Sequence, residues 1–400
     1  MSWSRAVRVA ALMFFAGPAA MAQPAAAWDP TAQALDPLVR DLCDREVVLL
    51  GEDASHGAGR PIELKTLIIS RLVDECAFGA VVFESQFYDF LDYERARVAG
   101  TATRQDLADA IGALWSRSRE MQPLIDFVHA RLAAGKLRVA GMDPQVGGVT
   151  GYFSQQKLAR ELAGQLEEPR RSACEAELSR HHSWKYDATN AFDDAAMGRL
   201  RACGGEIAER TARSAAAVSA EAAAMARSYS RYLAMSLDGD RDARDLGMFE
   251  NLMWHRARWP KGVKVIVWTA TSHASTTTTA ALPGRPLGSR VHETLGDRAA
   301  SIGFTALSGT FRTPGSRGKV MPLPAAESGS LEARFAPNGN APISYVSKTQ
   351  LREAGVVPGR ALNYAKPLPL DWSTVLDGLV VLREEHAIGT SSPFRALPVT

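Results

Sequence analysis

The sequence lacks the short motifs that identify several common enzyme classes. It contains no GxSxG nucleophile elbow, no HExxH and no phosphate-binding or dinucleotide-binding glycine pattern. It also has no CxxC, which argues against thiol redox chemistry and a zinc ribbon. If the protein is a hydrolase, a water molecule activated by a side-chain base is therefore the simpler nucleophile.

Two physical features are also missing. No basic tract stands out, so a nucleic-acid partner is not expected. No segment beyond the N-terminal region is apolar for long enough to cross a bilayer. The composition, 46% hydrophobic and 22% charged, is that of a globular protein, and 400 residues suit one large domain or two smaller ones.

The N-terminal segment has the three parts of a secretory signal peptide. Arg5 and Arg8 form a basic region, an apolar stretch follows, and AMA at residues 20–22 matches a small-x-small cleavage site. We therefore predict a signal peptide over residues 1–22 and a periplasmic or secreted mature protein over residues 23–400. An uncleaved membrane anchor is the alternative, but the apolar stretch is short for a bilayer.

Only four cysteines are present, and export to an oxidising compartment favours disulfide bonds. Four cysteines allow three pairings. The spacing favours Cys43–Cys76 and Cys174–Cys203, because each closes a loop of roughly 30 residues worth about 3–4 kcal/mol in the chain-entropy model. Four free buried thiols are the alternative.

The first half of the chain alternates between short apolar runs and helical patterns. REVVLLGE, AVVFE and LRVAGMD are typical of buried strands, and PIELKTLIISRLVDEC, QDLADAIGALW and QPLIDFVHARLAAG have helical periodicity. Later strands are predicted at VKVIVW, ASIGFTAL and GLVVLRE, and a loop at PGSRGKVMPLPAAESGS. Strands of this kind separated by helices predict an α/β fold with a mostly parallel central sheet flanked by helices.

The middle of the chain differs, because about residues 152–258 contain no strand pattern. RTARSAAAVSAEAAAMARSYSRYLAMSL has no glycine or proline and predicts one long helix, and DARDLGMFENLMWHRARW predicts another. We therefore expect a helical insertion at about residues 152–258 between two strands of one domain that spans residues 23–400.

Polar side chains that could carry chemistry follow four of the predicted strands. They are Glu52 and His56 after the first strand, Glu84 after the second, Asp143 and Gln145 after the third, and His273 after VKVIVW. Because ligands bind beyond the carboxyl ends of parallel strands, we expect these residues to share one site. Gly51, Gly57 and Gly59 are expected to allow the tight turn that carries His56.

Each of these residues also has a structural alternative. Glu84 on its own could cap the helix that follows it, and a lone histidine is more often structural than catalytic. The coincidence of four strand ends favours a functional site. The remaining six histidines are assigned to structure or surface: His129, His181, His182, His255, His292 and His386.

Several segments, in their order along the chain, resemble the erythromycin esterase family. They are LGEDASHG, AVVFES, VAGMDPQ, ARDLGMFENLMW, VIVWTATSHA and DWSTVLDGLVVLREEHAIGTSSP. The resemblance extends from about Val47 to the C-terminus. It implies an α/β core with a helical insertion and the hydrolysis of an ester or lactone without a covalent intermediate.

The resemblance also implies roles for individual residues. His56 takes the place of the histidine that activates water, Glu52 that of the glutamate in the same motif, and Glu84 that of a second essential glutamate. His273 takes the place of the second histidine in an HNxH segment, and Lys65 stands where the family has arginine. His56 is thus expected to be the general base, with Glu52 or Glu84 holding its ring. His273 and Lys65 are expected to stabilise the oxyanion.

Three further residues are expected to contact the substrate. They are Asp143, in a supporting position, Gln145, and Arg244 in the ARDLGMFENLMW segment. The substrate itself is expected to be a small molecule, and no cofactor is expected.

Three departures from the family pattern shape the expected function. Glu52 and His56 are four positions apart rather than three, Lys65 lacks the planar fork of arginine, and Ala270 and Thr271 stand where the family has His-Asn. We therefore expect an ester or lactone hydrolase that does not use 14-membered macrolides. Two alternatives remain: a metal-dependent hydrolase in which the same cluster holds a divalent ion, and a non-catalytic ligand-binding protein.

Overall fold

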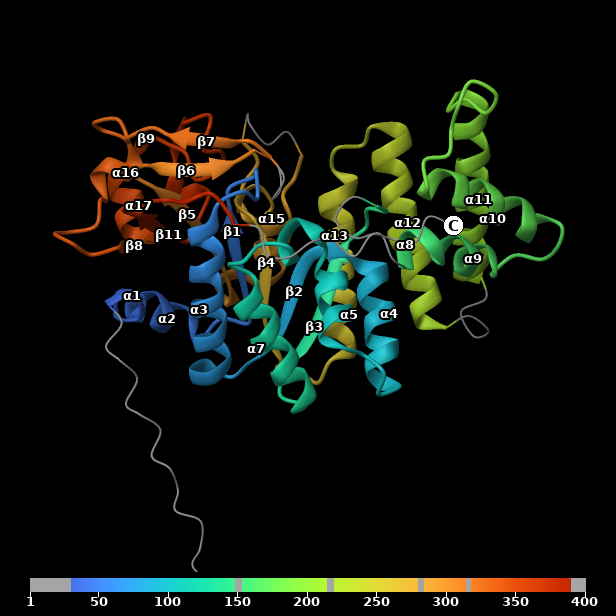
Figure 1. The fold of residues 1–400 in the computed structure, drawn as a ribbon, viewed down its shortest axis with the longest axis horizontal. Helices are drawn as coiled ribbons and strands as arrows, with labels where there is room; N and C mark the ends of the chain where they lie inside the picture. The colour runs from blue at the N-terminus through green and yellow to red at the C-terminus, as the bar shows by residue number, and fades with distance from the viewer. Residues whose placement is uncertain (1–29, 148–152, 214–218, 280–283, 314–317, 390–400) are drawn as a thin grey trace, which may run out of the picture.

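The protein is built around a sheet with helices on both faces (Figure 1). The computed structural model describes residues 30–147, 153–213, 219–279, 284–313 and 318–389. The predicted signal peptide lies outside the described residues. Within these ranges no helix is both long and apolar enough to span a bilayer.

Seven strands form the main sheet. They are β1 (Val47–Glu52), β2 (Phe78–Gln86), β3 (Arg138–Asp143), β4 (Lys264–Ala270), β5 (Ala299–Ala306), β8 (Ile343–Ser347) and β11 (Gly378–Leu382). Their spatial order is β3-β2-β4-β1-β5-β11-β8, and all neighbours are parallel except β8, which is antiparallel to β11. The predicted α/β fold with a mostly parallel sheet is therefore confirmed.

Alternating strand residues supply two separate cores. Val48 and Leu50 of β1 face one layer of helices, whereas Val47 and Leu49 face the other. The first layer comprises α2 (Asp36–Leu42), α3 (Gly59–Cys76), α5 (Arg104–Ile111) and α7 (Gln122–Ala133). The second comprises α13 (Ala243–Arg258), α14 (Thr271–Ala274) and α15 (Leu287–Leu295). Burial on both faces explains why these strands are continuously apolar.

The remaining short elements lie around this sandwich. They are α1 (Pro30–Ala34), α4 (Phe87–Val98), α6 (Ala113–Ser116), α16 (Leu331–Arg334), α17 (Lys348–Ala354), and the 3-10 turns Gly296–Arg298 and Trp372–Thr374. The segment QDLADAIGALW does not form one helix as predicted, because Gly112 adopts a φ of 92° and separates α5 from α6. A φ in this region is accessible to glycine at little cost.

Two small antiparallel sheets were not predicted. They pair β6 (Gly309–Arg312) with β7 (Val320–Leu323), and β9 (Val356–Gly359) with β10 (Leu368–Asp371). The stretch predicted as a loop thus contains strand β7. Val320 and Met321 pair with β6 although prolines and glycines surround them, so the local composition was misleading.

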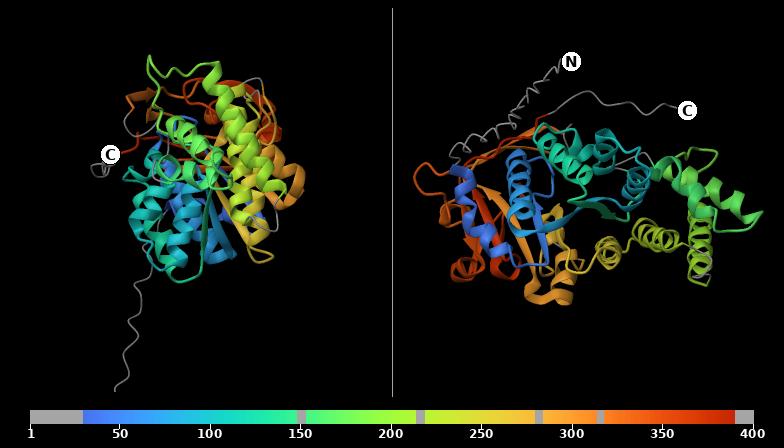
Figure 2. Two further views of the ribbon diagram at one scale, coloured as in Figure 1. Left: turned by 90° about the vertical axis from the view of Figure 1, so that its right-hand side faces the viewer. Right: turned by 90° about the horizontal axis from the view of Figure 1, so that it is seen from below.

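A helical lobe lies beyond the edge strand β3 (Figures 1 and 2). It comprises α8 (Phe153–Gln156), α9 (Leu158–Ala163), α10 (Arg170–His182), α11 (Asp194–Arg213) and α12 (Ala220–Asp238). The expected single helix across the Ala-rich run is wrong. Ser219 begins α12 as its N-cap, with its hydroxyl accepting a hydrogen bond from the backbone N–H of Ala222.

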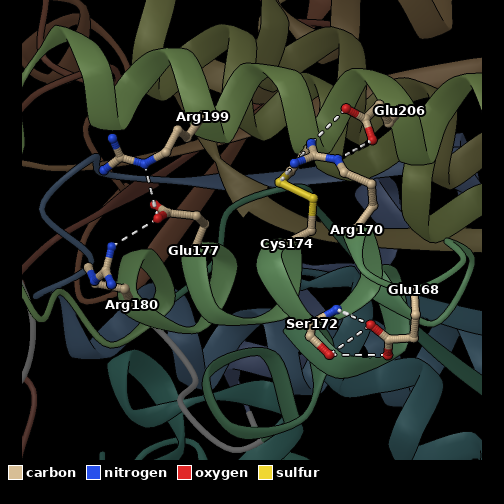
Figure 3. The surroundings of a disulfide bond; sticks show 9 residues. Glu168, Arg170, Ser172, Cys174, Glu177, Arg180, Arg199 and Glu206 are labelled. Carbon is tan, nitrogen blue, oxygen red and sulfur yellow. Dashed lines mark hydrogen bonds and ion pairs between the residues drawn. A yellow bond between two sulfur atoms is a disulfide. The ribbon is translucent and has the colours of Figure 1, made fainter.

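The predicted disulfide pairing is confirmed. Cys43 is bonded to Cys76, which joins the ends of α2 and α3, and Cys174 is bonded to Cys203, which joins α10 to α11. Figure 3 shows Arg170 beside the second bridge, where it forms an ion pair with Glu206 at 2.6 Å. The helical lobe therefore has a covalent link of its own.

Candidate active site

The loop between β1 and α3 carries His56 beside a buried glutamate. Glu52, the last residue of β1, is 1% exposed. Its Oε1 lies 2.8 Å from His56 Nδ1 and accepts a hydrogen bond from Trp115 Nε1 at 2.7 Å. Its Oε2 accepts from Lys65 Nζ at 3.1 Å. Glu52, rather than Glu84, is thus the carboxylate in contact with the His56 ring.

Charge holds this arrangement together. Burial opposes ionisation of Glu52, but the Lys65 ammonium and the contacts with His56 and Trp115 outweigh it and keep the pKa of Glu52 below its ordinary value. Burial lowers the pKa of Lys65, and Glu52 opposes that change. Lys65 is 0% exposed and also donates to the Thr269 carbonyl at 3.0 Å, so its contacts lie inside the protein.

His56 has an unusual backbone conformation. Its φ is +52°, a left-handed value that is costly for a residue with a side chain. The turn is stabilised by the backbone N–H of His56, which donates to the Asp53 carbonyl at 2.9 Å. The Asp53 carboxylate accepts from the backbone N–H groups of Ser55 and Tyr364. Such strain is typical of functional sites when the surroundings hold it in place.

The glycines of this loop have a different purpose from the one predicted. Positive φ values occur at His56, not at Gly51, Gly57 or Gly59. A Cβ at Gly57 would lie 2.1 Å from the Arg312 carbonyl oxygen, and a Cβ at Gly51 would lie 2.5 Å from the Thr271 Cα. These glycines therefore allow close approach of neighbouring segments, and the expectation that they form the turn itself is wrong.

A distant segment, residues 385–389, fastens the His56 loop. The Gly59 N–H donates to the His386 carbonyl at 2.8 Å, and the Ile388 N–H donates to the Gly57 carbonyl at 3.1 Å. The Glu385 carboxylate accepts from the backbone N–H of Arg60 and from the Tyr364 hydroxyl, each at 2.9 Å. Burial outweighs these hydrogen bonds and the charge of His386, and raises the pKa of Glu385 to about 7.

Glu84 is the centre of a second cluster. Its Oε2 accepts from the Thr269 hydroxyl at 2.7 Å and from the Ala270 backbone N–H at 2.8 Å, and its Oε1 accepts from Arg244 at 2.8 Å. Glu84 does not cap α4, whose N-cap is Gln86. Burial opposes its ionisation, but His273 and Arg244 outweigh burial and hold the pKa of Glu84 well below its ordinary value.

Arg244 joins the ends of three strands. Besides Glu84, its guanidinium donates to Asp143 Oδ2 at 2.7 Å and lies 3.0 Å from His273 Nε2. Asp143 also accepts from the Gln145 backbone N–H at 3.0 Å. The Gln145 side chain instead reaches Met235 of the helical lobe at 3.9 Å. The strand-end residues other than the Gln145 side chain therefore converge as predicted.

His273 sits between acids on both sides. Its Nδ1 lies 2.8 Å from Asp245 Oδ1, and its Nε2 lies 3.4 Å from Glu84 Oε1. Burial disfavours the imidazolium, but Glu84 and Asp245 outweigh burial and raise the pKa of His273. Asp245 is fixed by the backbone N–H of Leu287 at 2.8 Å.

The two clusters are adjacent. Thr269 contacts both, because its carbonyl accepts from Lys65 at 3.0 Å and its hydroxyl donates to Glu84 at 2.7 Å. Sequence reasoning missed Trp115 and Asp245, because neither follows a predicted strand. Asp245 stood next to Arg244 in a segment already singled out, which was the available signal.

Most of the six histidines assigned to structure contact other side chains or backbone carbonyls. His181 and His182 are buried and lie 3.1 Å from Tyr232 and 3.0 Å from Tyr229 in the helical lobe. His255 lies 3.2 Å from the Gly141 carbonyl. In the described ranges no three or more His, Cys, Asp or Glu side chains are grouped as metal ligands. Instead, the carboxylates of Glu52, Glu84 and Asp143 form ion pairs with Lys65 and Arg244.

The fold and site define an α/β protein in which a glutamate at the end of the central strand pairs with a histidine on the loop that follows. The sequence profile of the erythromycin esterase family matches residues 73–390, and the chain belongs to this family. Membership implies hydrolase activity. The matched part includes Glu84, Asp143, Arg244 and His273, whereas Glu52 and His56 precede it. No curated protein matches the sequence.

Three solved structures share the fold. A Bacillus cereus protein has 20% identity and a TM-score of 0.66, with 91% of this chain and 95% of that chain covered. A succinoglycan biosynthesis protein has 16% identity and a TM-score of 0.66, with 88% and 91% covered. A mutant of the erythromycin esterase EreC in its open conformation has 16% identity and a TM-score of 0.65, with 90% and 94% covered.

Proposed function

We propose that the protein hydrolyses an ester or lactone with His56 as the general base on water. The contact between His56 Nδ1 and Glu52 carries this proposal. An ionised carboxylate only accepts hydrogen bonds, so Nδ1 must be the protonated nitrogen. Nε2 then holds the lone pair that can take a proton from water. The His56 side chain is 14% exposed, which leaves an edge open to a substrate.

Lys65 takes a different role from oxyanion contact in this proposal. Its ammonium is buried against Glu52 and the Thr269 carbonyl, so we assign it to keeping Glu52 ionised. The developing oxyanion is placed at Arg244, whose guanidinium is the partly exposed N–H donor of the second cluster, and His273 is assigned to orienting that guanidinium through Nε2. Asp245 and Glu84 would support the charge on His273.

The proposed substrate is a small ester or lactone other than a 14-membered macrolide. Ala270 is 1% exposed and provides only its backbone N–H, which Glu84 already accepts. The site therefore lacks one imidazole that the resemblance led us to expect. Loss of a single oxyanion donor typically costs about 10²–10³ in rate.

Export completes the proposal. Two disulfides are compatible with a periplasmic or extracellular protein, since such bonds persist in oxidising compartments. We therefore retain the signal peptide over residues 1–22 and a mature chain from Gln23 as part of the proposed function.

The decisive experiment is a screen of mature protein against esters and lactones, with His56→Ala beside wild type. We expect His56→Ala to lose at least about 100-fold in kcat/KM, as for a general base, with little change in Tm. His129→Ala is the matched control, because His129 lies on α7, a helix that contributes no residue to either cluster. Retention of more than about a tenth of the rate would contradict the assignment. Loss of activity on chelation would select a metal-dependent reaction, and tight binding without turnover a binding protein.

A further inference from the structure

Trp115 is a buried tryptophan whose one polar atom points at the carboxylate behind His56. It is 0% exposed, and its Nε1–H donates to Glu52 Oε1 at 2.7 Å. The same oxygen lies 2.8 Å from His56 Nδ1. The indole and imidazole rings also meet edge to face, with centroids 5.2 Å apart and an interplanar angle of 81°. Trp115 therefore touches both members of the His56–Glu52 pair.

The local fold explains how Trp115 reaches this position. Gly112 interrupts the helical segment, and the short helix α6 begins again at Ala113 in a new direction. The indole then packs edge to face against Trp268 of β4, with centroids 6.5 Å apart. An uninterrupted helix would have carried this side chain in another direction.

We propose that Trp115 is a positioning residue that fixes the orientation, tautomer and basicity of His56 through Glu52. The inference rests on the proposed function only in that His56 is taken as the base. Two donors share Oε1, and Lys65 occupies Oε2, so the carboxylate cannot rotate without breaking a buried hydrogen bond. The Trp115 N–H also competes with His56 for the negative charge on Oε1, which limits how strongly Glu52 stabilises the imidazolium.

Other charged groups face His56 as well. Glu84 of β2 and Asp53 of the same loop interact with it electrostatically, and Lys65 of α3 lies behind Glu52. Among these groups, Lys65 and Trp115 are the two that donate hydrogen bonds to Glu52. In our proposal neither of them contacts the substrate. Removal of the Trp115 N–H leaves the Lys65 contact in place and so isolates the contribution of one hydrogen bond.

The test is Trp115→Phe, which removes the N–H and keeps an aromatic ring. The matched control is Trp372→Phe, since the Trp372 ring is equally buried but its Nε1–H donates to the Val357 carbonyl at 3.1 Å in a separate core. Histidine side chains labelled with ¹⁵N are followed by NMR through a pH titration, and the His56 signals are assigned with His56→Gln. This readout needs no substrate.

In wild type we expect neutral His56 to carry its proton on Nδ1, which is the less common tautomer in water. In Trp115→Phe we expect the His56 titration midpoint to rise by about half a pH unit or more, because a hydrogen bond to a charged acceptor has been removed. In Trp372→Phe the midpoint should not move. Once a substrate is identified, the acid limb of the pH profile of kcat/KM should move by the same amount. Trp115→Phe should therefore lower kcat/KM, relative to wild type, roughly threefold more at pH 6 than at pH 8.

An Nε2–H tautomer in wild type would overturn the inference, and that measurement does not depend on whether Trp115→Phe folds. An unchanged His56 titration in folded Trp115→Phe, or an equal shift in Trp372→Phe, would overturn it as well. A shifted titration in a protein that hydrolyses no ester would support the inference about Trp115 and refute the proposed function.

Discussion

Glu385 should make the protein less stable as the pH rises through neutrality. The carboxyl group is 2% exposed, and its hydrogen bonds come from neutral donors, the backbone N–H groups of Arg60 and His386 and the Tyr364 hydroxyl. Its pKa in the folded protein is about 7, against an ordinary value of 4.5. A raised pKa means that the stabilisation is fully present below pH 4.5 and is lost as the pH rises through about 7.

The magnitude follows from the same two values. One pH unit of difference corresponds to about 1.36 kcal/mol, so ionisation of Glu385 should cost the folded state roughly 3 kcal/mol at pH 8. Glutamine removes this cost and keeps the shape. Its carbonyl oxygen can accept from Arg60 and His386, and its amide can donate to the Tyr364 hydroxyl, which becomes the acceptor.

The assay is urea unfolding of wild type and Glu385→Gln at pH 5 and pH 8. We expect similar free energies of unfolding at pH 5 and a variant more stable than wild type by up to roughly 3 kcal/mol at pH 8. Glu384→Gln is the control, because the neighbouring Glu384 is exposed and should respond little at either pH. An identical difference between Glu385→Gln and wild type at both pH values would refute the reasoning.

Three further outcomes are expected. Reduction of the disulfides should destabilise the mature protein, and Cys174→Ser with Cys203→Ser should lower the free energy of unfolding by about 3–4 kcal/mol; four titratable thiols in unreduced protein would contradict this. Lys65→Met should lower the free energy of unfolding by about 3–5 kcal/mol, because Glu52 is left charged without its buried lysine partner. Lys136→Met, at an exposed position, should lower it little in the same urea titration. Incubation with erythromycin should show no efficient ring opening by mass spectrometry, and turnover above about 1 s⁻¹ would show that alanine at position 270 does not prevent macrolide hydrolysis.

The sheet could be predicted because its information is local. Val47 to Leu50, and the corresponding runs in β2, β3 and β4, are buried on both faces and therefore continuously apolar. Parallel strands end at the same edge, so the polar residues that follow them had to converge. The disulfide pairing could be predicted as well, since the spacing of the cysteines along the sequence alone favoured the observed pairing.

Other features depend on partners distant in sequence. β7 forms because β6 pairs with it, and a Pro/Gly-rich stretch gives little sign of that pairing. Trp115 and Asp245 enter the site from helices, where an indole or a carboxylate looks like any other helical residue until the neighbouring strand ends are placed. The left-handed φ of His56 could not be read from its sequence neighbours, which suggested that the glycines would provide the turn.

The bonds between the His56 loop and residues 385–389 bear on how activity is acquired during synthesis. The loop belongs to the first strand-to-helix connection of the sheet, yet its backbone partners are made more than three hundred residues later. Contacts of such long sequence separation form late, because a large loop must close first. A nascent or truncated chain that ends before Glu385 would hold Glu52 on β1 but lack what keeps His56 in its strained turn. If His56 is the general base, as proposed, hydrolysis would then begin only after nearly all of the chain has been synthesised and folded.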